Sequence, residues 1–418
     1  MVDEILSAAL RRELLDASRP WAVFFDRERL NRRFERLQAA FPEGSLHAVA
    51  IKANPLGAVL RELVDAGAGL EAASFGEVKL AMAAGLEGPN IVFDSPAKTA
   101  REIEASLNAD LYLNADNFAE LARIADCEPG PTARVGLRVN PLVGAGSIDV
   151  TSVSRADSKF GVPLSGKEDE LVEAFRRHPW LRGLHVHTGS QGYGVDLLVE
   201  GARRCVDLAL RIERELGAGR IDTVDIGGGL PVAYRPDDVA PTVEDYADAL
   251  RAQVPELFND RWRLITEFGR WLHGPCAFAA SRVEYVKESA AGPIAVVHFG
   301  ADLMLRPAYR PDDWYHHISV HDARGATLET EDAEQLTVAG PLCFAGDVIA
   351  RRRPLPRPAP GDILVAHDVG AYTFSMWSRY CSRSFPRIYG YDSSGPDTEF
   401  QVLHPGEDAD ELVDFWSP

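Results

Sequence analysis

The sequence is poor in cysteine, and its few cysteines are not spaced for pairing or for metal binding. The 418 residues contain five, Cys127, Cys205, Cys276, Cys343 and Cys381, and no two of them form a CxxC motif. This spacing argues against a disulfide scaffold and against the common zinc motifs, so we expect no metal site. We therefore expect a reduced, cytoplasmic protein in which any special cysteine is special for its chemistry.

Long hydrophobic runs are also missing. No stretch approaches the ~18 apolar residues that a membrane-spanning helix needs. Residues 1–20 carry early acids and lack the basic head and apolar core of a secretory signal. The sequence therefore predicts neither a membrane partner nor export.

Positive charge is scarce. Lys and Arg number 44 against 63 Asp and Glu, which gives a formal net charge of −19. Such a surface repels phosphate backbones, so we expect no nucleic-acid partner. The densest basic run, residues 351–353, stands among prolines and is expected to be a solvated loop. Hydrophobic residues make up 46% and charged residues 26%, as is usual for a soluble globular protein.

The first two thirds of the chain alternate short β-like runs with helical patterns, several of which end at glycine. This alternation predicts a parallel sheet, and eight such runs favour a closed (β/α)8 barrel. The eight runs span residues 46–51, 70–74, 90–93, 110–114, 133–139, 181–187, 223–226 and 263–267.

From about residue 280 the pattern changes to β-like runs separated by Pro- and Gly-rich turns, with little helical periodicity. This texture predicts a second, mainly antiparallel β domain. We therefore expect a barrel domain over residues 22–280 and a β domain over 281–418, with residues 1–21 packing on the β domain.

Polar residues follow several barrel strands at their carboxyl ends, where barrel enzymes place their sites. Lys52 directly follows the first strand, and a partly desolvated lysine suits Schiff-base formation. The alternative is a strand-end lysine that reaches solvent. His185 and His187 lie on one face of the sixth strand, but no third metal ligand is near them in sequence, so packing in the core explains them better.

Glycines and a charged pair mark the ends of the last two barrel strands. Gly227, Gly228 and Gly229 can cradle a phosphate with their backbone N–H groups, or simply form a tight turn. They lack the GxGxxG form of a dinucleotide site. Glu267 and Arg270 are three residues apart, and a surface ion pair is the alternative there.

Nine ordered motifs together resemble the fold-type III pyridoxal-phosphate decarboxylases, which include the diaminopimelate, ornithine and biosynthetic arginine decarboxylases. The resemblance runs from about residue 20 to 400. It implies a barrel of the alanine-racemase type, a following β domain and a head-to-tail homodimer. The motifs are AVAIKANP, EAASFGEV, SKFG, HVHTGSQ, DIGGGLPV, EFGR, RPAY, GPLCFAGD and GAYTFSMWSRY.

The resemblance implies a role for each matching residue toward pyridoxal 5'-phosphate. Lys52 would bind it covalently, His187 would stack on its ring, and Glu267 would face its ring nitrogen. A carboxylate at that nitrogen keeps it protonated and favours decarboxylation, whereas the alanine racemases place an arginine there. The phosphate would be held by Gly227, Gly228, Gly229, Ser190, Gly269 and Arg270, with Tyr372 closing over it.

The resemblance also implies that each site is shared by two chains. Cys343 matches a cysteine contributed by the partner subunit, a general acid that returns a proton to the substrate carbon. An isolated buried cysteine would be the alternative. Lys159 and Asp347 match a pair that the family joins across the dimer interface.

Three positions depart from the family pattern. EFGR replaces the usual EPGR, and Cys381 stands where the family has Asn, with an effect that the sequence does not define. Phe344 follows the catalytic cysteine, where diaminopimelate and ornithine decarboxylases carry an acid that grips the substrate's distal ammonium. Leaving that ammonium without its partner would cost about 1–3 kcal/mol, and a cation–π contact would recover about 0.5–2 kcal/mol.

The nearby residues are positive or neutral. Arg306 and Tyr309 match residues that bind the distal carboxylate in diaminopimelate decarboxylases, and His316 and His317 follow closely. We therefore expect a decarboxylase for a small amino acid with an anionic or bulky distal group, such as the siderophore intermediate citryl-diaminopropionate. The alternatives are diaminopimelate decarboxylase of lysine biosynthesis and, in another class, a non-catalytic cofactor-binding relative.

Overall fold

The structure is a computed structural model that describes residues 1–329, 333–392, 395 and 397–417. The chain forms two compact units. The barrel unit comprises residues 31–232 and 239–272, and the β unit comprises residues 1–30, 233–238 and the chain from 273 onward. The sequence-based boundaries at 22 and 280 differ from this division, because residues 21–26 form a strand of the β sheet.

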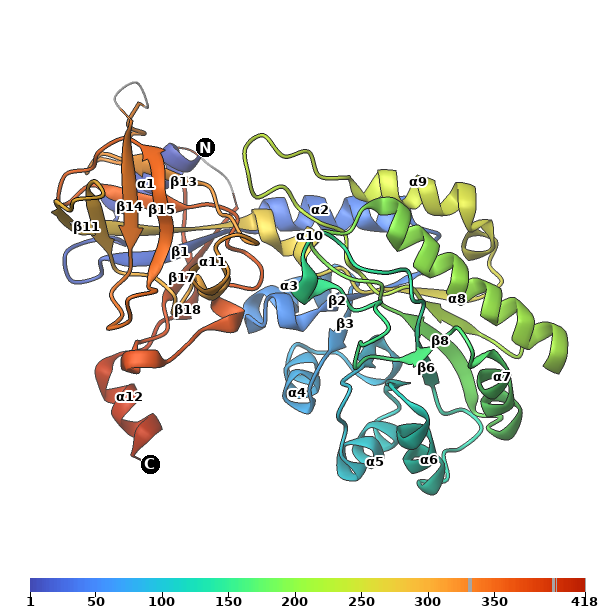
Figure 1. The fold of residues 1–418 in the computed structure, drawn as a ribbon. Helices are drawn as coiled ribbons and strands as arrows, with labels where there is room; N and C mark the ends of the chain where they lie inside the picture. The colour runs from blue at the N-terminus through green and yellow to red at the C-terminus, as the bar shows by residue number, and fades with distance from the viewer. Residues whose placement is uncertain (330–332, 393–394, 396, 418) are drawn as a thin grey trace. The chain divides into compact units, whose positions relative to one another are not determined.

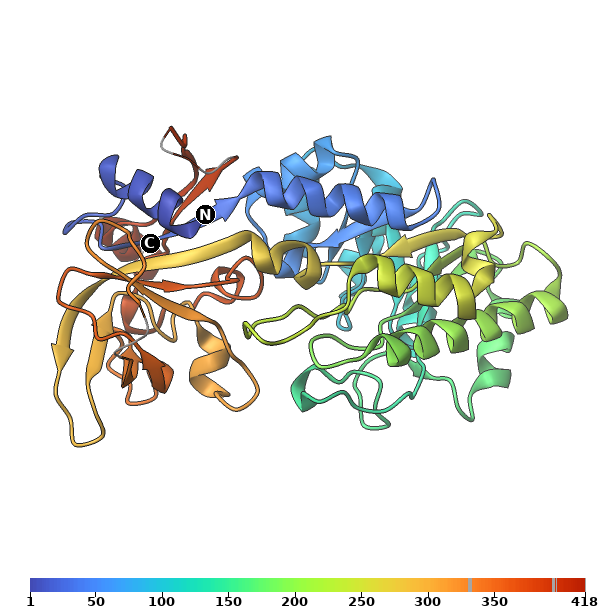
Figure 2. The ribbon, with the colours of Figure 1, turned by 90° about the horizontal axis from the view of Figure 1, so that it is seen from above.

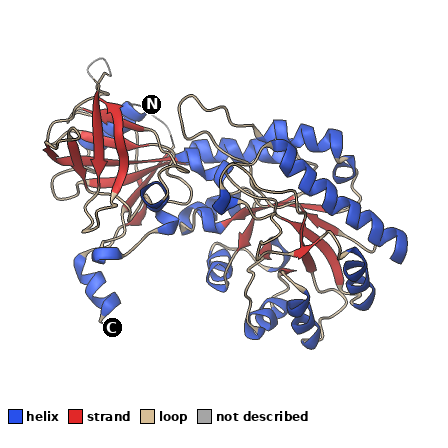
Figure 3. Ribbon diagram, in the orientation of Figure 1, coloured by secondary structure: helices blue, strands red, loops and turns tan. Residues whose placement is uncertain are grey.

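Eight parallel strands of the barrel unit occupy the eight runs expected from the sequence. Their order is β5-β4-β3-β2-β10-β9-β8-β6, and β6 pairs back with β5, which closes the barrel (Figures 1 and 3). The strands are β2 (Leu46–Ala50), β3 (Gly69–Ala72), β4 (Ile91–Phe93), β5 (Tyr112–Ala115), β6 (Val135–Asn140), β8 (Leu181–Val186), β9 (Thr223–Asp225) and β10 (Arg263–Thr266), and the short β7 (Val162–Pro163) pairs with β6.

Helices surround this barrel (Figure 3). Their ends follow local sequence signals: Ser74 caps α4, Thr99 and Glu102 form a capping box on α5, and glycines follow α3 and α4 at positive φ. The long α8 lies beside α9 in both views (Figures 1 and 2). The helices are α2 (Arg27–Ala40), α3 (Gly57–Asp65), α4 (Phe75–Ala83), α5 (Ala100–Asn108), α6 (Phe118–Asp126), α7 (Glu168–Arg177), α8 (Val195–Leu216), α9 (Val243–Gln253) and α10 (Arg270–His273).

The β unit contains a mostly antiparallel sheet, as the sequence predicts. Its main order is β15-β14-β12-β11-β1-β17-β18, and β16 joins β11 to β13. The strands are β1 (Trp21–Asp26), β11 (Ala277–Lys287), β12 (Ile294–Val297), β13 (Ile318–His321), β14 (Glu334–Ala339), β15 (Val348–Leu355), β16 (Ile363–Ala366), β17 (Arg387–Tyr391) and β18 (Gln401–Pro405), with helices α1 (Val2–Arg11), α11 (Leu305–Tyr309) and α12 (Ala409–Trp416).

The N-terminal helix belongs to the core of the β unit. Ile5, Leu6 and Ala9 of α1 pack with Phe24 and Phe278 in one buried cluster. Burying these side chains is the main favourable term that holds α1 on the sheet. No helix in the described part of the chain has the length and apolar character needed to cross a bilayer.

The basic run at residues 351–353 is not a loop, so that expectation was wrong. It lies within β15, which pairs antiparallel with β14. Arg353 is partly buried, donates a hydrogen bond to the carbonyl of His316 and lies over the Tyr315 ring. The prolines that follow the run indicated a loop. The first of them, Pro354, pairs with Gln335 near the end of β15, and the end of a strand tolerates proline.

Candidate active site

Titratable side chains from six barrel strands gather at the carboxyl ends of those strands. Because parallel strands all end on the same rim, residues far apart in sequence meet there. Most of these side chains are buried, so their charges are poorly screened and strongly coupled. The group comprises Lys52 after β2, Glu71 on β3, Asp94 after β4, His185 on β8, Asp225 on β9 and Glu267 after β10.

Lys52 emerges from β2 in a single 3₁₀ turn, and its ammonium forms an ion pair with the fully buried Glu71. Burial raises the pKa of Glu71 to about 8, although Lys52 acts to lower it. A carboxyl that titrates near neutral pH, in contact with an amine, can accept or return a proton at the lysine nitrogen.

The glycine loop after β9 is a preformed turn. Gly227 and Gly229 have φ values of +65° and +109°, which glycine adopts without strain. A Cβ on Gly228 would lie 2.3 Å from the Glu267 carbonyl oxygen, so this position has no room for a side chain. Two of its N–H groups are paired within the barrel unit, that of Gly227 with Asp225 Oδ1 and that of Gly228 with His187 Nδ1, so the phosphate contact expected of this loop stays a prediction.

His187 is held against this loop. The Gly228 N–H donates to its Nδ1 at 3.2 Å, so Nδ1 carries no proton. Burial, reinforced by Arg138 and Lys52, lowers the pKa of His187 well below its ordinary value. The ring is therefore a neutral imidazole, a flat face suited to stacking.

Glu267 is buried, and its Oε2 lies 3.6 Å from His185 Nε2 and 3.9 Å from His187 Nδ1. Its backbone N–H donates to the Gly227 carbonyl at 2.8 Å, which ties the carboxylate to the glycine loop. Asp225 sits beneath that loop and accepts a hydrogen bond from the Gly227 N–H at 2.9 Å. Burial, followed by the charge of Glu267, raises the pKa of Asp225 well above its ordinary range.

The remaining barrel residues expected around the phosphate also meet. Arg270, the first residue of α10, is buried with its Nε 3.4 Å from Ser190 Oγ. A Cβ on Gly269 would lie 2.8 Å from the Ala53 Cβ, beside the turn that carries Lys52. Gly269 thus allows close packing between the loop after β10 and the lysine turn. The sequence interpretation gave it a phosphate contact, and that role stays a prediction.

The β unit brings another set of the expected residues together. The Arg306 guanidinium lies 4.5 Å from the centre of the Trp314 ring and 4.7 Å from that of Tyr372. Tyr372 has a φ of +56°, an uncommon conformation for a side chain of its size and one that often marks a functional site. The arrangement fixes a cation between two aromatic faces.

Cys343 stands at the exposed tip of a tight loop between β14 and β15. Asp347 is buried under this loop and accepts hydrogen bonds from the backbone N–H groups of Ala301 and Leu342 at 2.5 and 2.7 Å. The Asp347 carboxylate thus organises the loop within its own unit. Lys159 is exposed in the barrel unit, and its pairing with Asp347 across a dimer stays a prediction.

Phe344, next to Cys343, stacks on Tyr309. The ring centres are 5.3 Å apart and the planes are tilted by 21°. Phe344 also packs against the small cluster of Ala301, Ala308 and Leu342. Tyr309 is 57% exposed, so this pair presents an aromatic surface to solvent rather than filling a core.

His316 and His317, expected at the substrate, pack within the β unit. His316 is buried, donates its Nδ1–H to the His367 carbonyl at 2.8 Å and lies 4.7 Å from the Tyr234 ring. His317 lies 4.8 Å from the His367 ring. Their role at the substrate, expected from their proximity to Arg306 in the sequence, stays a prediction.

Three candidate site residues were missed or set aside when only the sequence was considered. Glu71 lies inside the quoted EAAS motif, but only the fold shows that it faces Lys52. Asp94 follows β4 directly, a strand-end position like that of Lys52. His185 was assigned to core packing because no third acidic or ligand-type residue was near it in sequence. The barrel supplies two, Asp94 and Glu267.

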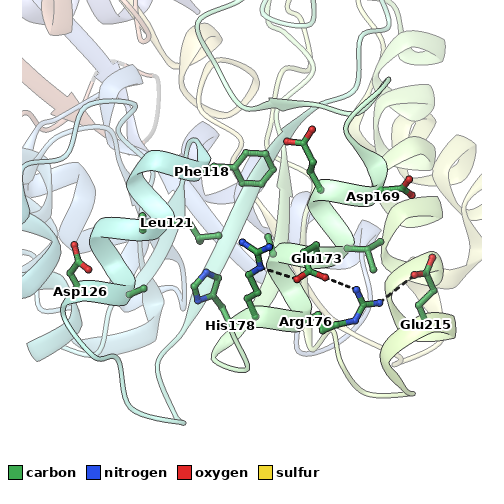
Figure 4. A pocket seen from close by; sticks show the side chains of 14 residues that line it. Phe118, Leu121, Asp126, Asp169, Glu173, Arg176, His178 and Glu215 are labelled. Atoms are coloured by element: carbon green, nitrogen blue, oxygen red, sulfur yellow. Dashed lines mark hydrogen bonds and ion pairs between the residues drawn. The ribbon is translucent and has the colours of Figure 1, made fainter.

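A separate cavity of about 910 Å³ lies between α6 and α7, on the outside of the barrel. Figure 4 shows its wall of acidic and basic side chains, in which Arg176 pairs with both Glu173 and Glu215. It contains none of the candidate residues. We therefore place the active site at the strand ends.

Comparison with known proteins identifies the family. Residues 27–274 match the model of the pyridoxal-dependent decarboxylases, pyridoxal binding domain. The chain belongs to the pyridoxal-dependent decarboxylase family. The matched segment covers the whole barrel and includes every strand end described above.

Full-length relatives extend the match through the β unit. The diaminopimelate decarboxylase of Methanothermobacter thermautotrophicus is 32% identical over 385 residues, or 90% of this chain and 87% of that protein. That of Archaeoglobus fulgidus is 33% identical over 393 residues, with 92% and 90% covered. A crystal structure of diaminopimelate decarboxylase from Helicobacter pylori complexed with L-lysine has a TM-score of 0.84 at 26% identity and covers 97% of this chain and 99% of that one.

The chain is therefore a carboxy-lyase that uses pyridoxal phosphate, and its strand-end residues fit that cofactor. Glu267 Oε1 is buried without a hydrogen-bond partner in the described residues, as befits a carboxylate that faces a ring N–H. The buried Arg270 and the neighbouring Ser190 offer a cation and a hydroxyl to the phosphate. Lys52 supplies an amine beside a carboxyl able to exchange its proton.

Proposed function

We propose that this decarboxylase acts on diaminopimelate and releases its α-carboxylate as CO2. The observation that carries the proposal is the similarity to diaminopimelate decarboxylases along about nine tenths of the chain, through both units. The cationic site at Arg306 agrees with it, since diaminopimelate has a carboxylate at its distal end.

In this proposal the barrel unit holds the cofactor. Lys52 Nζ would bond to it, the loop of Gly227–Gly229 with Ser190 and Arg270 would hold its phosphate, and the neutral His187 ring would stack on it. When bound, pyridoxal phosphate accepts the electron pair that remains as CO2 departs. Glu71 takes or returns the proton of Lys52 Nζ as the substrate amine displaces it, a task that suits its pKa of about 8.

Glu267 stabilises the cofactor's ring nitrogen in its protonated form. It is able to do so because it is buried, where a carboxylate and a cation attract each other much more strongly than in water. Glu267 therefore acts on the electronic step, whereas Lys52 and Glu71 act on the exchange of amines.

The β unit supplies the proton donor and the substrate contacts. Cys343 Sγ–H gives a proton to the α-carbon after CO2 has left, and its exposed position at a loop tip is open to a second protomer. Tyr372 closes the cofactor site, and Arg306 binds the distal carboxylate. We propose that each site combines the barrel of one protomer with the Cys343 loop of its partner in a homodimer.

A second candidate substrate follows from Phe344. The Phe344–Tyr309 stack is apolar and offers no negative charge to a distal ammonium. An amino acid with an anionic or bulky distal end and no ammonium, such as citryl-diaminopropionate, would leave no ammonium unpaired on this surface, and Arg306 would pair with its distal carboxylate.

Measuring CO2 release by the purified holoenzyme from diaminopimelate, citryl-diaminopropionate, ornithine and lysine separates the two. Diaminopimelate turnover at about 10⁴ M⁻¹s⁻¹ or more supports the first proposal. Poor turnover of diaminopimelate with efficient turnover of citryl-diaminopropionate supports the second. A protein that takes up no pyridoxal phosphate contradicts both.

A further inference from the structure

His185 occupies a position that the roles above leave unexplained. It lies on β8, is fully buried, and its Nε2 is 3.6 Å from both Asp94 Oδ2 and Glu267 Oε2. Neither of its ring nitrogens has a hydrogen-bond partner in the described part of the chain. A core histidine chosen for packing alone would not face two carboxylates, because burying unpaired charges is costly.

The position of Nε2 favours one form of the ring. Carboxylate oxygens offer lone pairs, so a bare Nε2 lone pair between two of them would be repelled by both. A hydrogen on Nε2 would instead be directed between Asp94 and Glu267 and be attracted by both. A proton on Nδ1 as well would make the ring a cation that stabilises both carboxylates.

The surroundings show which carboxylates keep their charge. The titratable groups around Glu267 are His185, His187, Asp94, Glu71 and Asp225, and the cations Lys52, Lys98 and Arg138 act on Asp94. Burial raises the pKa of Glu71 and of Asp225, so these two tend to hold protons. Burial also acts to raise the pKa of Asp94, but His185, Arg138, Lys52 and Lys98 together outweigh it and keep that pKa below its ordinary value.

We propose that Asp94 and His185 are positioning residues that keep Glu267 ionised through the chain Asp94–His185–Glu267. This inference rests on the proposed role of Glu267 at the cofactor's ring nitrogen. The proton shared between that nitrogen and Glu267 lies on the nitrogen when the carboxylate is stabilised from behind by the His185 N–H. Without Asp94, the His185 N–H is a weaker donor to Glu267, and the proton moves toward Glu267. Outer-sphere partners of this kind typically change activity by about 10–100-fold.

The test uses holoenzyme that carries pyridoxal phosphate labelled with ¹⁵N in the ring. The variants Asp94→Asn and His185→Gln should move the ¹⁵N shift from the protonated toward the unprotonated value. Glu213→Gln is the matched control, because Glu213 is a buried carboxylate on α8 that pairs with Arg261, outside the site. It should leave the shift unchanged. Thermal melting of each holoenzyme shows that the variants are folded.

A second readout excludes a merely structural effect. With pyridoxal phosphate, Asp94→Asn should lower kcat on the best substrate about tenfold with little change in KM. With a cofactor analogue that has carbon in place of the ring nitrogen, Asp94→Asn and the unaltered enzyme should be equally slow. An equal loss with both cofactors would overturn the inference.

Three other results would overturn it or locate the failure elsewhere. Unchanged ¹⁵N shifts in both variants would contradict the chain of contacts. The three side chains also have donor atoms within 4.8 Å of one another, so one Zn²⁺ bound tightly per cofactor-free chain and lost in Asp94→Asn would assign them to a metal. An unprotonated ring nitrogen in the unaltered enzyme would instead refute the role of Glu267. Because the shift needs no substrate, a wrong substrate assignment leaves this test intact.

Discussion

The two units of the chain carry their candidate residues in opposite ways. In the barrel unit Glu71, His185 and Glu267 are at most 3% exposed and interact with one another across strand ends. In the β unit Cys343 and Tyr309 are exposed and stand on a loop and a short helix. Buried, coupled charges suit chemistry that is the same for every substrate, whereas exposed aromatic and loop residues suit recognition that differs between substrates.

The difference also predicts how a substitution in each unit affects activity. A substitution among the buried barrel charges alters several protonation states at once, because each group is coupled to its neighbours. A substitution on the Phe344–Tyr309 surface alters only what contacts it. The comparison therefore predicts that barrel variants lose turnover of every substrate, and that variants of the β-unit surface change the preference among substrates.

Lys52→Ala should have the largest effect. It removes the amine that bonds to the cofactor, and we expect at least a ~10³-fold loss of turnover for every substrate together with loss of the covalent absorbance band. Lys79→Ala, which alters an exposed lysine on α4, is the control and should behave like the unaltered enzyme. Near-normal activity in pure Lys52→Ala would refute the assignment.

Mixing Lys52→Ala with Cys343→Ala subunits tests whether the two units complete each other between protomers. Each mixed dimer would contain one intact site if Cys343 acts on the partner's barrel. With random exchange, half of the dimers are mixed, so about a quarter of the normal activity should return. Subunit exchange is followed with differently tagged chains. An inactive mixture with proven exchange would place both residues in the site of one chain.

The barrel could be predicted from sequence more fully than its site. All eight strands fall where hydrophobic runs predict them, because a buried parallel strand needs little besides its own apolar residues. Lys52, His187 and Glu267 were found because they end such runs within recognisable motifs. Asp94 and His185 were not assigned to one site. They are 91 residues apart, no local sequence signal links them, and only closure of the barrel brings them together.

The β unit was harder to predict at its edges. Arg351–Arg353 was expected as a loop, since charge and proline both disfavour strands. In β15, however, Arg351 and Arg352 are exposed, whereas Arg353 is partly buried and contacts both a carbonyl and an aromatic ring. Likewise, the boundary expected at residue 22 placed most of β1 in the barrel domain. Its pairing with β11, more than 250 residues later, is invisible to local patterns.

Phe344→Glu should change preference and leave the barrel chemistry intact. A carboxylate beside Tyr309 offers a partner to a distal ammonium, so we expect kcat/KM for diaminopimelate to rise about tenfold relative to citryl-diaminopropionate. Phe344→Leu is the control, because it removes the aromatic ring without adding charge. An equal loss on all substrates would show that Phe344 supports the Cys343 loop rather than selecting substrates.

The smallest expected effect compares one buried histidine in each unit as the pH falls. Burial lowers the pKa of His367 in the β unit to about 3, and that of His47 in the barrel to about 4. Nearby His317 and His321 add to the effect at His367, whereas His47 is bonded to Thr266 Oγ1 at 2.8 Å. Both rings are neutral in the folded protein at pH 5, while in the unfolded chain they bind a proton below pH ~6.5.

The sign of the pH dependence follows from this difference. The stability that each neutral ring contributes is fully present above pH ~6.5 and is lost as the pH falls toward the folded value. Between these two pH values, proton uptake by each histidine on unfolding should lower the free energy of unfolding by at most about 1.4 kcal/mol for each pH unit of acidification. His367→Gln and His47→Gln should each make urea unfolding between pH 6.5 and 4.5 less dependent on pH, with His178→Gln as a more exposed control. Hydrogen exchange, followed separately in the two units, should assign each change to its own unit. A slope that stays unchanged in both variants would show that other groups set the acid limit of this protein.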